Sequence, residues 1–301
     1  GSGALRDPLL ALAAEMAFDQ SFREFARKTQ GTSPVLSMIL QRIETMRAIA
    51  EQHEQAPSMT ETTSHVELAG LGRTLVKRGG KTLSEIKKLP REVLFYLVDH
   101  QAVERDVLME TFWPHYNPGR QISNLHTAIY TLRRALGRDA ILQSGTQYSL
   151  NPDLPVVCDV HEYERAANVA LSLPPGDPRR LFALTAAINS YHGQFLPEFA
   201  SEWVVERRRR LEMRYLDLLA THAEEALVRD QPVRAVTTLR QALEIDPLRD
   251  DTNMRLLEAL GRLGRRSEVV AHYQRYVRLL ADELGLDPPE ELRQLYARLI
   301  G

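Results

Sequence analysis

Apolar residues recur every three or four positions between residues 122 and 136. This spacing predicts an amphipathic helix with one stripe facing a core, formed by Ile122, Leu125, Ile129, Leu132 and Leu136. Residues 140–150 then read as two short strands around Gly145, the pattern of a β-hairpin. A helix followed directly by a hairpin indicates a winged helix.

The preceding segment predicts the rest of such a domain. Short strands are expected at 66–68, 74–77 and 81–83, and Gly79-Gly80 permits the tight turn between the last two. Helices are expected over 90–101 and 104–113, the second ended by Pro114 and the turn at 117–119.

A 34-residue period marks the second half of the chain. Ala235, Leu239 and Ala242 are matched 34 residues later by Val269, Tyr273 and Tyr276, which is the tetratricopeptide period. Upstream helices are expected over 159–172, 178–192 and 201–229. Stacked helix pairs of this kind bury their faces on one another and leave a concave surface for a partner.

Residues 4–55 read as two helices broken at Gly31-Thr32-Ser33-Pro34, and 55–64 as a linker. The helical pair is either a packing or dimerising appendage or the end of a sensor domain. The predicted fold class is mainly α: a short helical segment, a winged helix-turn-helix and tetratricopeptide-like repeats. The expected domains are 1–63, 64–153 and 154–301.

Composition narrows the class of protein. No run of eighteen apolar residues occurs, so no membrane span is expected. The start, Gly1-Ser2-Gly3, resembles a cloning remnant rather than a signal peptide, so we expect a fragment of a longer protein. The single cysteine, Cys158, stands among valines and reads as a core residue of a cytoplasmic protein.

Charge distribution says more than the net charge of −2. Residues 64–153 hold 12 Lys and Arg against 9 Asp and Glu, a balance of +3, while the remainder of the chain sums to −5. A locally positive module fits a DNA-binding domain.

The polar face of the 122–136 helix carries the candidate DNA contacts. Asn and Arg side chains suit adenine and guanine in the major groove, and no Asp or Glu occurs between residues 120 and 138. An ordinary solvated face is the alternative. Around the predicted hairpin, the residues expected to lie nearest the DNA phosphates are Arg138, Gln143, Thr146 and Gln147. The face itself comprises Arg120, Ser123, Asn124, Thr127, Thr131 and Arg134.

Other chemistry is not indicated. The chain has no GxxxxGK[ST] phosphate loop, no histidine pair at metal-ligand spacing and no nucleophile elbow, so we expect neither catalysis nor a metal or cofactor. Residues 207–210, four consecutive arginines, read as a solvated helix face, with a phosphate or acidic-partner contact as the alternative. Trp203 is expected in the core.

Several motifs, in order, resemble a known family over residues 65–300. They are similar to the OmpR-like winged helix and the helical bacterial transcriptional activation domain of the antibiotic-regulatory, or SARP-type, activators. The motifs are Leu94-Phe-Tyr-Leu97, Leu108-Met-Glu-Thr-Phe-Trp-Pro114, Ile129-Tyr-Thr-Leu-Arg-Arg-Ala-Leu-Gly137, Tyr148-Ser-Leu150, Cys158-Asp-Val-His-Glu-Tyr163, Tyr191-His-Gly-Gln-Phe-Leu-Pro197, Glu202-Trp-Val-Val-Glu-Arg-Arg208, Asp246-Pro-Leu-Arg249 and Leu280-Ala-Asp-Glu-Leu-Gly-Leu-Asp-Pro288.

The resemblance implies an activator that binds direct-repeat promoter sites, often as a dimer, and recruits RNA polymerase. The chain departs from the pattern at Gln147 and Ser149, where members commonly carry glycine and arginine. The implied DNA contacts are Arg120, Asn124, Thr127, Thr131, Arg133 and Arg134.

The sequence therefore predicts a DNA-binding transcriptional activator that binds double-stranded promoter DNA. The loop 115–119 is the candidate polymerase contact, through His115, Tyr116 and Asn117. Two alternatives stay open: a signalling scaffold in which both halves bind protein, and the effector end of a larger regulatory ATPase.

Overall fold

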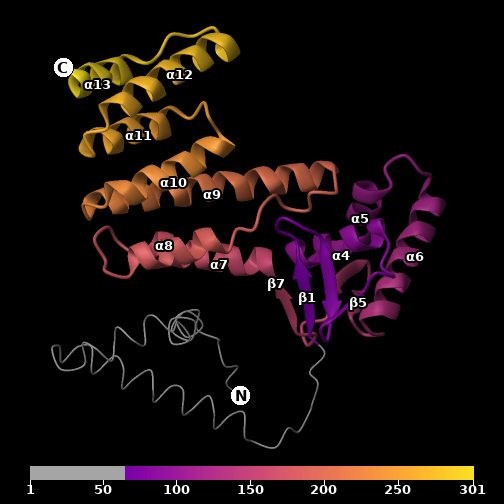
Figure 1. Cartoon of the computed structure of the whole chain (residues 1–301). Coiled ribbons are helices and arrows are strands. Elements are labelled where there is room, and N and C mark those ends of the chain that lie inside the picture. The colour runs from indigo at the N-terminus through magenta and orange to yellow at the C-terminus, as the bar shows by residue number, and fades with distance from the viewer. Residues whose placement is uncertain (1–64) are drawn as a thin grey trace, which may run out of the picture. The chain divides into compact units, whose positions relative to one another are not determined.

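A computed structural model describes residues 65–301 (Figure 1). The predicted helical hairpin at 4–55 and its linker lie outside the described residues. In the described part the chain is mainly helical with two small sheets, which confirms the predicted fold class.

The first sheet has the strand order β3-β2-β1-β7. Its strands are β1 (Val66–Ala69), β2 (Leu75–Arg78), β3 (Lys81–Thr82) and β7 (Val156–Cys158). Strand β1 alternates buried and half-buried positions, so Val66 and Leu68 face the core. Gly79 and Gly80 both have positive φ in the β2–β3 turn, as the sequence predicts.

Three helices and a second sheet complete the winged helix. The helices are α4 (Lys88–His100), α5 (Arg105–Phe112) and α6 (Pro118–Leu136). The sheet has the order β4-β6-β5, formed by β4 (Ala102–Glu104), β5 (Ile141–Ser144) and β6 (Gln147–Leu150). The hairpin β5–β6 is the predicted wing, whereas β4 was not expected. Its three residues exist as a strand because Val103 pairs with Tyr148 across the sheet.

The second half is a stack of helices in chain order (Figure 1). The predicted 34-residue period is confirmed, because Ala235, Leu239, Val269 and Tyr276 are buried in one core and Tyr273 packs against it; Ala242 is buried as well. The helices are α7 (Asp159–Ser172), α8 (Arg180–Asn189), α9 (Glu202–Val228), α10 (Pro232–Ile245), α11 (Asp250–Arg262), α12 (Arg266–Leu284) and α13 (Glu290–Ile300).

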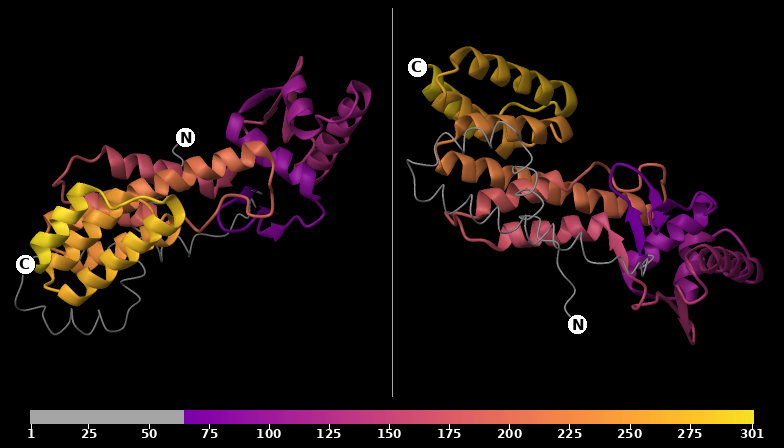
Figure 2. Two further views of the ribbon diagram at one scale, coloured as in Figure 1. Left: turned by 90° about the horizontal axis from the view of Figure 1, so that it is seen from above. Right: turned by 60° about the horizontal axis from the view of Figure 1, so that its bottom comes forward.

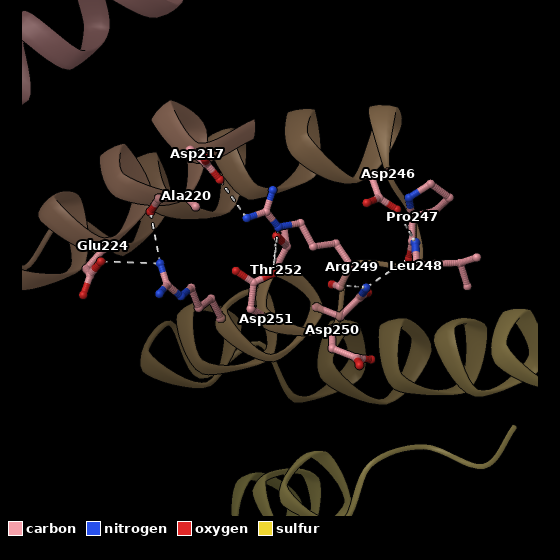
Figure 3. A network of polar contacts seen from close by, with 12 residues as sticks. Asp217, Ala220, Glu224, Asp246, Pro247, Leu248, Arg249, Asp250, Asp251 and Thr252 are labelled. Atoms are coloured by element: carbon pink, nitrogen blue, oxygen red, sulfur yellow. Dashed lines mark hydrogen bonds and ion pairs between the residues drawn. The ribbon is translucent and has the colours of Figure 1, made fainter. Parts of the chain in front are cut away.

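Arginines on α11 and just before it tie the repeats together on their polar side (Figure 3). Arg249 donates to Asp217 on α9 and to Asp251, each at 3.0 Å. Arg255 donates to the carbonyl of Ala220 at 3.3 Å and lies 3.5 Å from the carboxylate of Glu224. These bonds complement the apolar packing of α9 on α10 and of α10 on α11.

The winged helix and the repeats share one sheet and one compact unit. Strand β7, which leads into α7, pairs in parallel with β1, so Leu68 lies opposite Cys158. The carboxylate of Asp159, the first residue of α7, accepts hydrogen bonds from the backbone N–H groups of Gly70 and Leu71 at 2.8–3.0 Å. The first residues of the repeat half therefore complete the fold of the preceding half.

An aromatic cluster fills the same junction. The ring of Trp203, at the start of α9, packs edge-on against Tyr96 of α4 with the centroids 5.0 Å apart. Its indole N–H donates to the buried carboxylate of Glu92 at 3.0 Å, and the Ser201 hydroxyl donates to the same oxygen. Trp203 is half-buried and packs against the core, as expected.

The arginine run at 207–210 is not the solvated face that the sequence predicts. Arg207 donates to Asp99 on α4 at 2.9 Å and to Glu164 on α7 at 2.8 and 2.9 Å. Arg208 donates to the carbonyls of Phe195, Leu196 and Phe199. Successive residues point about 100° apart on a helix, so two of the four face inward. Of these four arginines, Arg209 and Arg210 are exposed and the other two are half-buried.

Candidate nucleic-acid interface

Helix α6 is the element that carries most of the predicted contacts, and its start is well defined. The side chain of Asn117 accepts a hydrogen bond from the backbone N–H of Arg120 at 3.0 Å, and Pro118 is the first helical residue. This is a preferred N-cap followed by the residue type favoured at N1. The Gln121 amide donates to the Trp113 carbonyl at 2.9 Å, which fixes α6 against the end of α5.

The outer face of α6 is open. Arg120, Ser123, Thr127 and Arg134 are exposed, while the buried stripe of Leu125, Ala128, Ile129, Leu132 and Leu136 seals the opposite face into the core. In Figure 1 and in both views of Figure 2, α6 lies on the side of the winged helix away from α9–α13. The helical stack therefore does not cover the residues predicted to read DNA.

Two hydroxyls on this face are bonded to the helix itself. Thr127 donates to the carbonyl of Ser123 at 2.9 Å, and Thr131 donates to that of Thr127 at 2.8 Å. Their oxygens keep lone pairs, so each hydroxyl can accept a hydrogen bond from a base while its own hydrogen stays on the helix.

A groove of about 700 Å³ runs beside α6, between it, the start of α4 and the end of α5. The predicted residues Asn124, Thr127, Thr131 and Arg134 all line it, together with Lys87 at the N-cap of α4. The same groove is also lined by Glu85 and by apolar side chains such as Leu89 and Phe112, so the two cations and the polar groups of α6 stand on a mixed concave surface.

Arg133 is placed differently from Arg134. Its Nε donates to the carbonyl of Ile141 at 3.0 Å and its side chain is half-buried, so it joins α6 to the wing. One residue on, Arg134 points about 100° further round the helix and is exposed. Of the two, Arg134 has the more accessible guanidinium.

The wing is held by an acidic residue. Glu104 on β4 accepts hydrogen bonds from the Thr146 hydroxyl at 2.7 Å and from the Gln147 amide at 2.8 Å. Gly145, with φ of 61°, makes the turn. Thr146 is exposed but its hydroxyl hydrogen is directed to Glu104, whereas Arg138, between α6 and the wing, is exposed without such a partner in the described residues.

The loop proposed to meet polymerase is exposed as well. His115, Tyr116 and Asn117 all lie at the surface. The guanidinium of Arg120 sits over the Tyr116 ring, 4.9 Å from its centroid, a cation–π geometry that orients the arginine. The Asn117 side chain serves α6 as its cap.

Two residues that line the groove, Lys87 and Tyr130, are not among the contacts predicted from the sequence. Tyr130 could have been found from the helical phase, because it stands three residues after Thr127 and four before Arg134. Lys87 could not, because it comes from a loop about forty residues earlier.

Elsewhere, Cys158 is buried and burial raises the pKa of its thiol to about 11, as suits a core residue. Within residues 65–301, no group of three His, Cys, Asp or Glu side chains is arranged to hold a metal ion. In the same range, no helix combines the length and apolarity needed to span a bilayer.

Comparison with known proteins assigns the helical half. Residues 158–300 match the family described as bacterial transcriptional activator domain. The regulatory protein AfsR of Streptomyces griseus is 26% identical over 250 residues, covering 82% of this chain and 26% of that protein. The chain thus spans about a quarter of the length of this relative.

Shorter relatives match over most of their length. The transcriptional regulatory protein MoaR1 of Mycobacterium tuberculosis is 24% identical, over 84% of this chain and 85% of MoaR1. The regulatory protein DnrI of Streptomyces peucetius is 25% identical, over 75% of this chain and 88% of DnrI. MoaR1 is thus named a transcriptional regulatory protein and DnrI a regulatory protein.

The fold is shared with a solved structure of a mycobacterial protein. The structure of Mycobacterium tuberculosis EmbR in complex with a low affinity phosphopeptide superimposes with a TM-score of 0.64 at 23% identity, covering 78% of this chain and 65% of that one. At this identity the likeness concerns the fold alone.

Proposed function

We propose that this chain is a SARP-type transcriptional activator that acts by binding promoter DNA. The match of residues 158–300 to the bacterial transcriptional activator domain and the similarity to AfsR and DnrI support this proposal. Helix α6 enters the major groove of direct-repeat sites. The helical domain and the loop at 115–117 then recruit RNA polymerase, and catalysis has no part in this function.

The observation that carries the proposal is the outer face of α6. It projects a continuous row of donors and acceptors, from Arg120 through Asn124 and Thr127 to Arg134, with no acidic side chain between residues 120 and 138. A 19-residue helix with a free polar face is the element that major-groove readers insert. Lys87 and Arg138 flank this face and are placed to neutralise phosphates.

Alanine variants test the proposal in two ways. After selection of bound fragments from a random DNA pool, Arg134→Ala and Asn124→Ala should each weaken the selected site by about 1–3 kcal/mol per lost base contact. Lys87→Ala should weaken all sequences alike and lower the salt slope of binding.

The matched control is Arg210→Ala, which removes an exposed arginine of α9 outside this face. Binding isotherms by fluorescence anisotropy at several salt concentrations give both quantities. The proposal fails if no sequence is enriched, or if log affinity does not depend on log salt.

Recruitment is tested separately by transcription in vitro. His115→Ala should lower transcript yield from the selected site while the affinity for DNA changes little, whereas Tyr116→Ala would also release Arg120 and is therefore not used for this test. An equal loss of DNA affinity and transcript would contradict a polymerase-contacting role for this loop.

A further inference from the structure

Tyr130 is an aromatic residue where the fold gives it no packing role. It lies on the outer face of α6 with 66% of its surface exposed. Within residues 65–301, its ring stacks on no other ring and its hydroxyl has no hydrogen-bond partner. Because most of its surface is open, the side chain is free to contact a ligand.

Its neighbours indicate the kind of ligand. Tyr130 is one turn from both Thr127 and Arg134, and all three line the groove beside α6. Among the residues of α6, Tyr130 is the one exposed large side chain with an apolar body. The groove also contains apolar side chains from α4 and α5, among them Leu89 and Phe112. On α6 itself, the neighbours of the ring are Thr127 and Arg134, whose polar groups suit bases and phosphates.

Resting on the proposed function, we propose that Tyr130 is a specificity-determining residue whose ring contacts the 5-methyl group of a thymine. In the major groove only thymine presents a methyl group, and apolar side chains read it by contact. Tyr130 thereby adds an apolar element to the hydrogen-bonding readout by Asn124 and Arg134, and favours thymine at one position of each half-site.

The experiment removes the methyl group from the DNA and the ring from the protein. The site selected by the wild-type chain is synthesised with deoxyuridine replacing each thymidine in turn, and the affinity of the wild type, Tyr130→Ala and Tyr130→Phe is measured by anisotropy. Loss of one buried methyl contact should weaken wild-type binding about fourfold at a single position.

Tyr130→Phe keeps the ring and should retain that fourfold effect. Tyr130→Ala should bind the thymidine site and the deoxyuridine site with equal affinity at that position. An unchanged methyl effect in Tyr130→Ala overturns the inference while leaving the proposed function intact. Normal DNA affinity of Tyr130→Ala combined with lost transcription would instead show a protein-contacting ring and also overturn it. A wild-type chain with no preferred sequence would sink the proposed function itself.

Discussion

Arg207 gives the sharpest test of how the two halves are joined. Its side chain is 12% exposed and touches Asp99 (13% exposed) and Glu164 (25% exposed), at 2.7–2.9 Å, on two different helices. Arg207→Met keeps the length of the apolar stem but leaves two carboxylates close together without their cation.

The expected cost follows from burial. Breaking a buried ion pair by removing one partner costs about 3–5 kcal/mol, because a charge is left unpaired. Glu164 is a quarter exposed and can regain water, so the lower end, about 3 kcal/mol, is expected for Arg207→Met. Urea unfolding followed by circular dichroism measures the change, provided that the slope with urea stays constant.

Arg209→Met is the matched control, because Arg209 is exposed on the same helix; it should change stability by less than about 0.5 kcal/mol. The triple variant Asp99→Asn, Glu164→Gln, Arg207→Met should recover part of the loss, since no bare charge remains. The reasoning is refuted if Arg207→Met and Arg209→Met have the same stability, or if the triple variant is less stable than Arg207→Met.

Three other predictions concern the described core and junction. His222 is 5% exposed and burial lowers its pKa to about 4, so the unfolded chain binds its proton first and this residue should withdraw about 3 kcal/mol of stability as pH falls from 6.5 to 4. His222→Gln should flatten the pH dependence of urea unfolding, and an identical profile would contradict the assignment. A Cβ at Gly72 would lie 2.3 Å from the His192 carbonyl oxygen, whereas Gly80 has a similar φ and open space; Gly72→Ala should therefore lower the melting temperature well beyond Gly80→Ala, and equal shifts would rule out the clash. Cys158 should react with a thiol reagent at pH 8 only in denaturant, because its thiol is buried and its pKa is raised to about 11; prompt reaction of the folded protein would disprove this.

Helical periodicity determined much of this protein from the sequence alone. The helices α6 and α7 and the 34-residue repeat follow from apolar residues three and four positions apart, a local relation that any helix must satisfy. The wing hairpin is equally local, because Gly145 makes a turn between adjacent strands. The polar face of α6 could be read in the same way.

Tertiary structure decided what depends on distant partners. Strands β4 and β7 are too short to show in a pattern, and each exists through pairing with a strand more than forty residues away. Arg207 faces inward because Asp99 and Glu164 compensate its charge. These carboxylates are 108 and 43 positions away in the sequence, so a pattern of neighbouring residues cannot predict the contact. Likewise, the sequence alone does not distinguish Arg133 from Arg134. In the structure, Arg133 donates a hydrogen bond to the carbonyl of Ile141, whereas Arg134 is accessible.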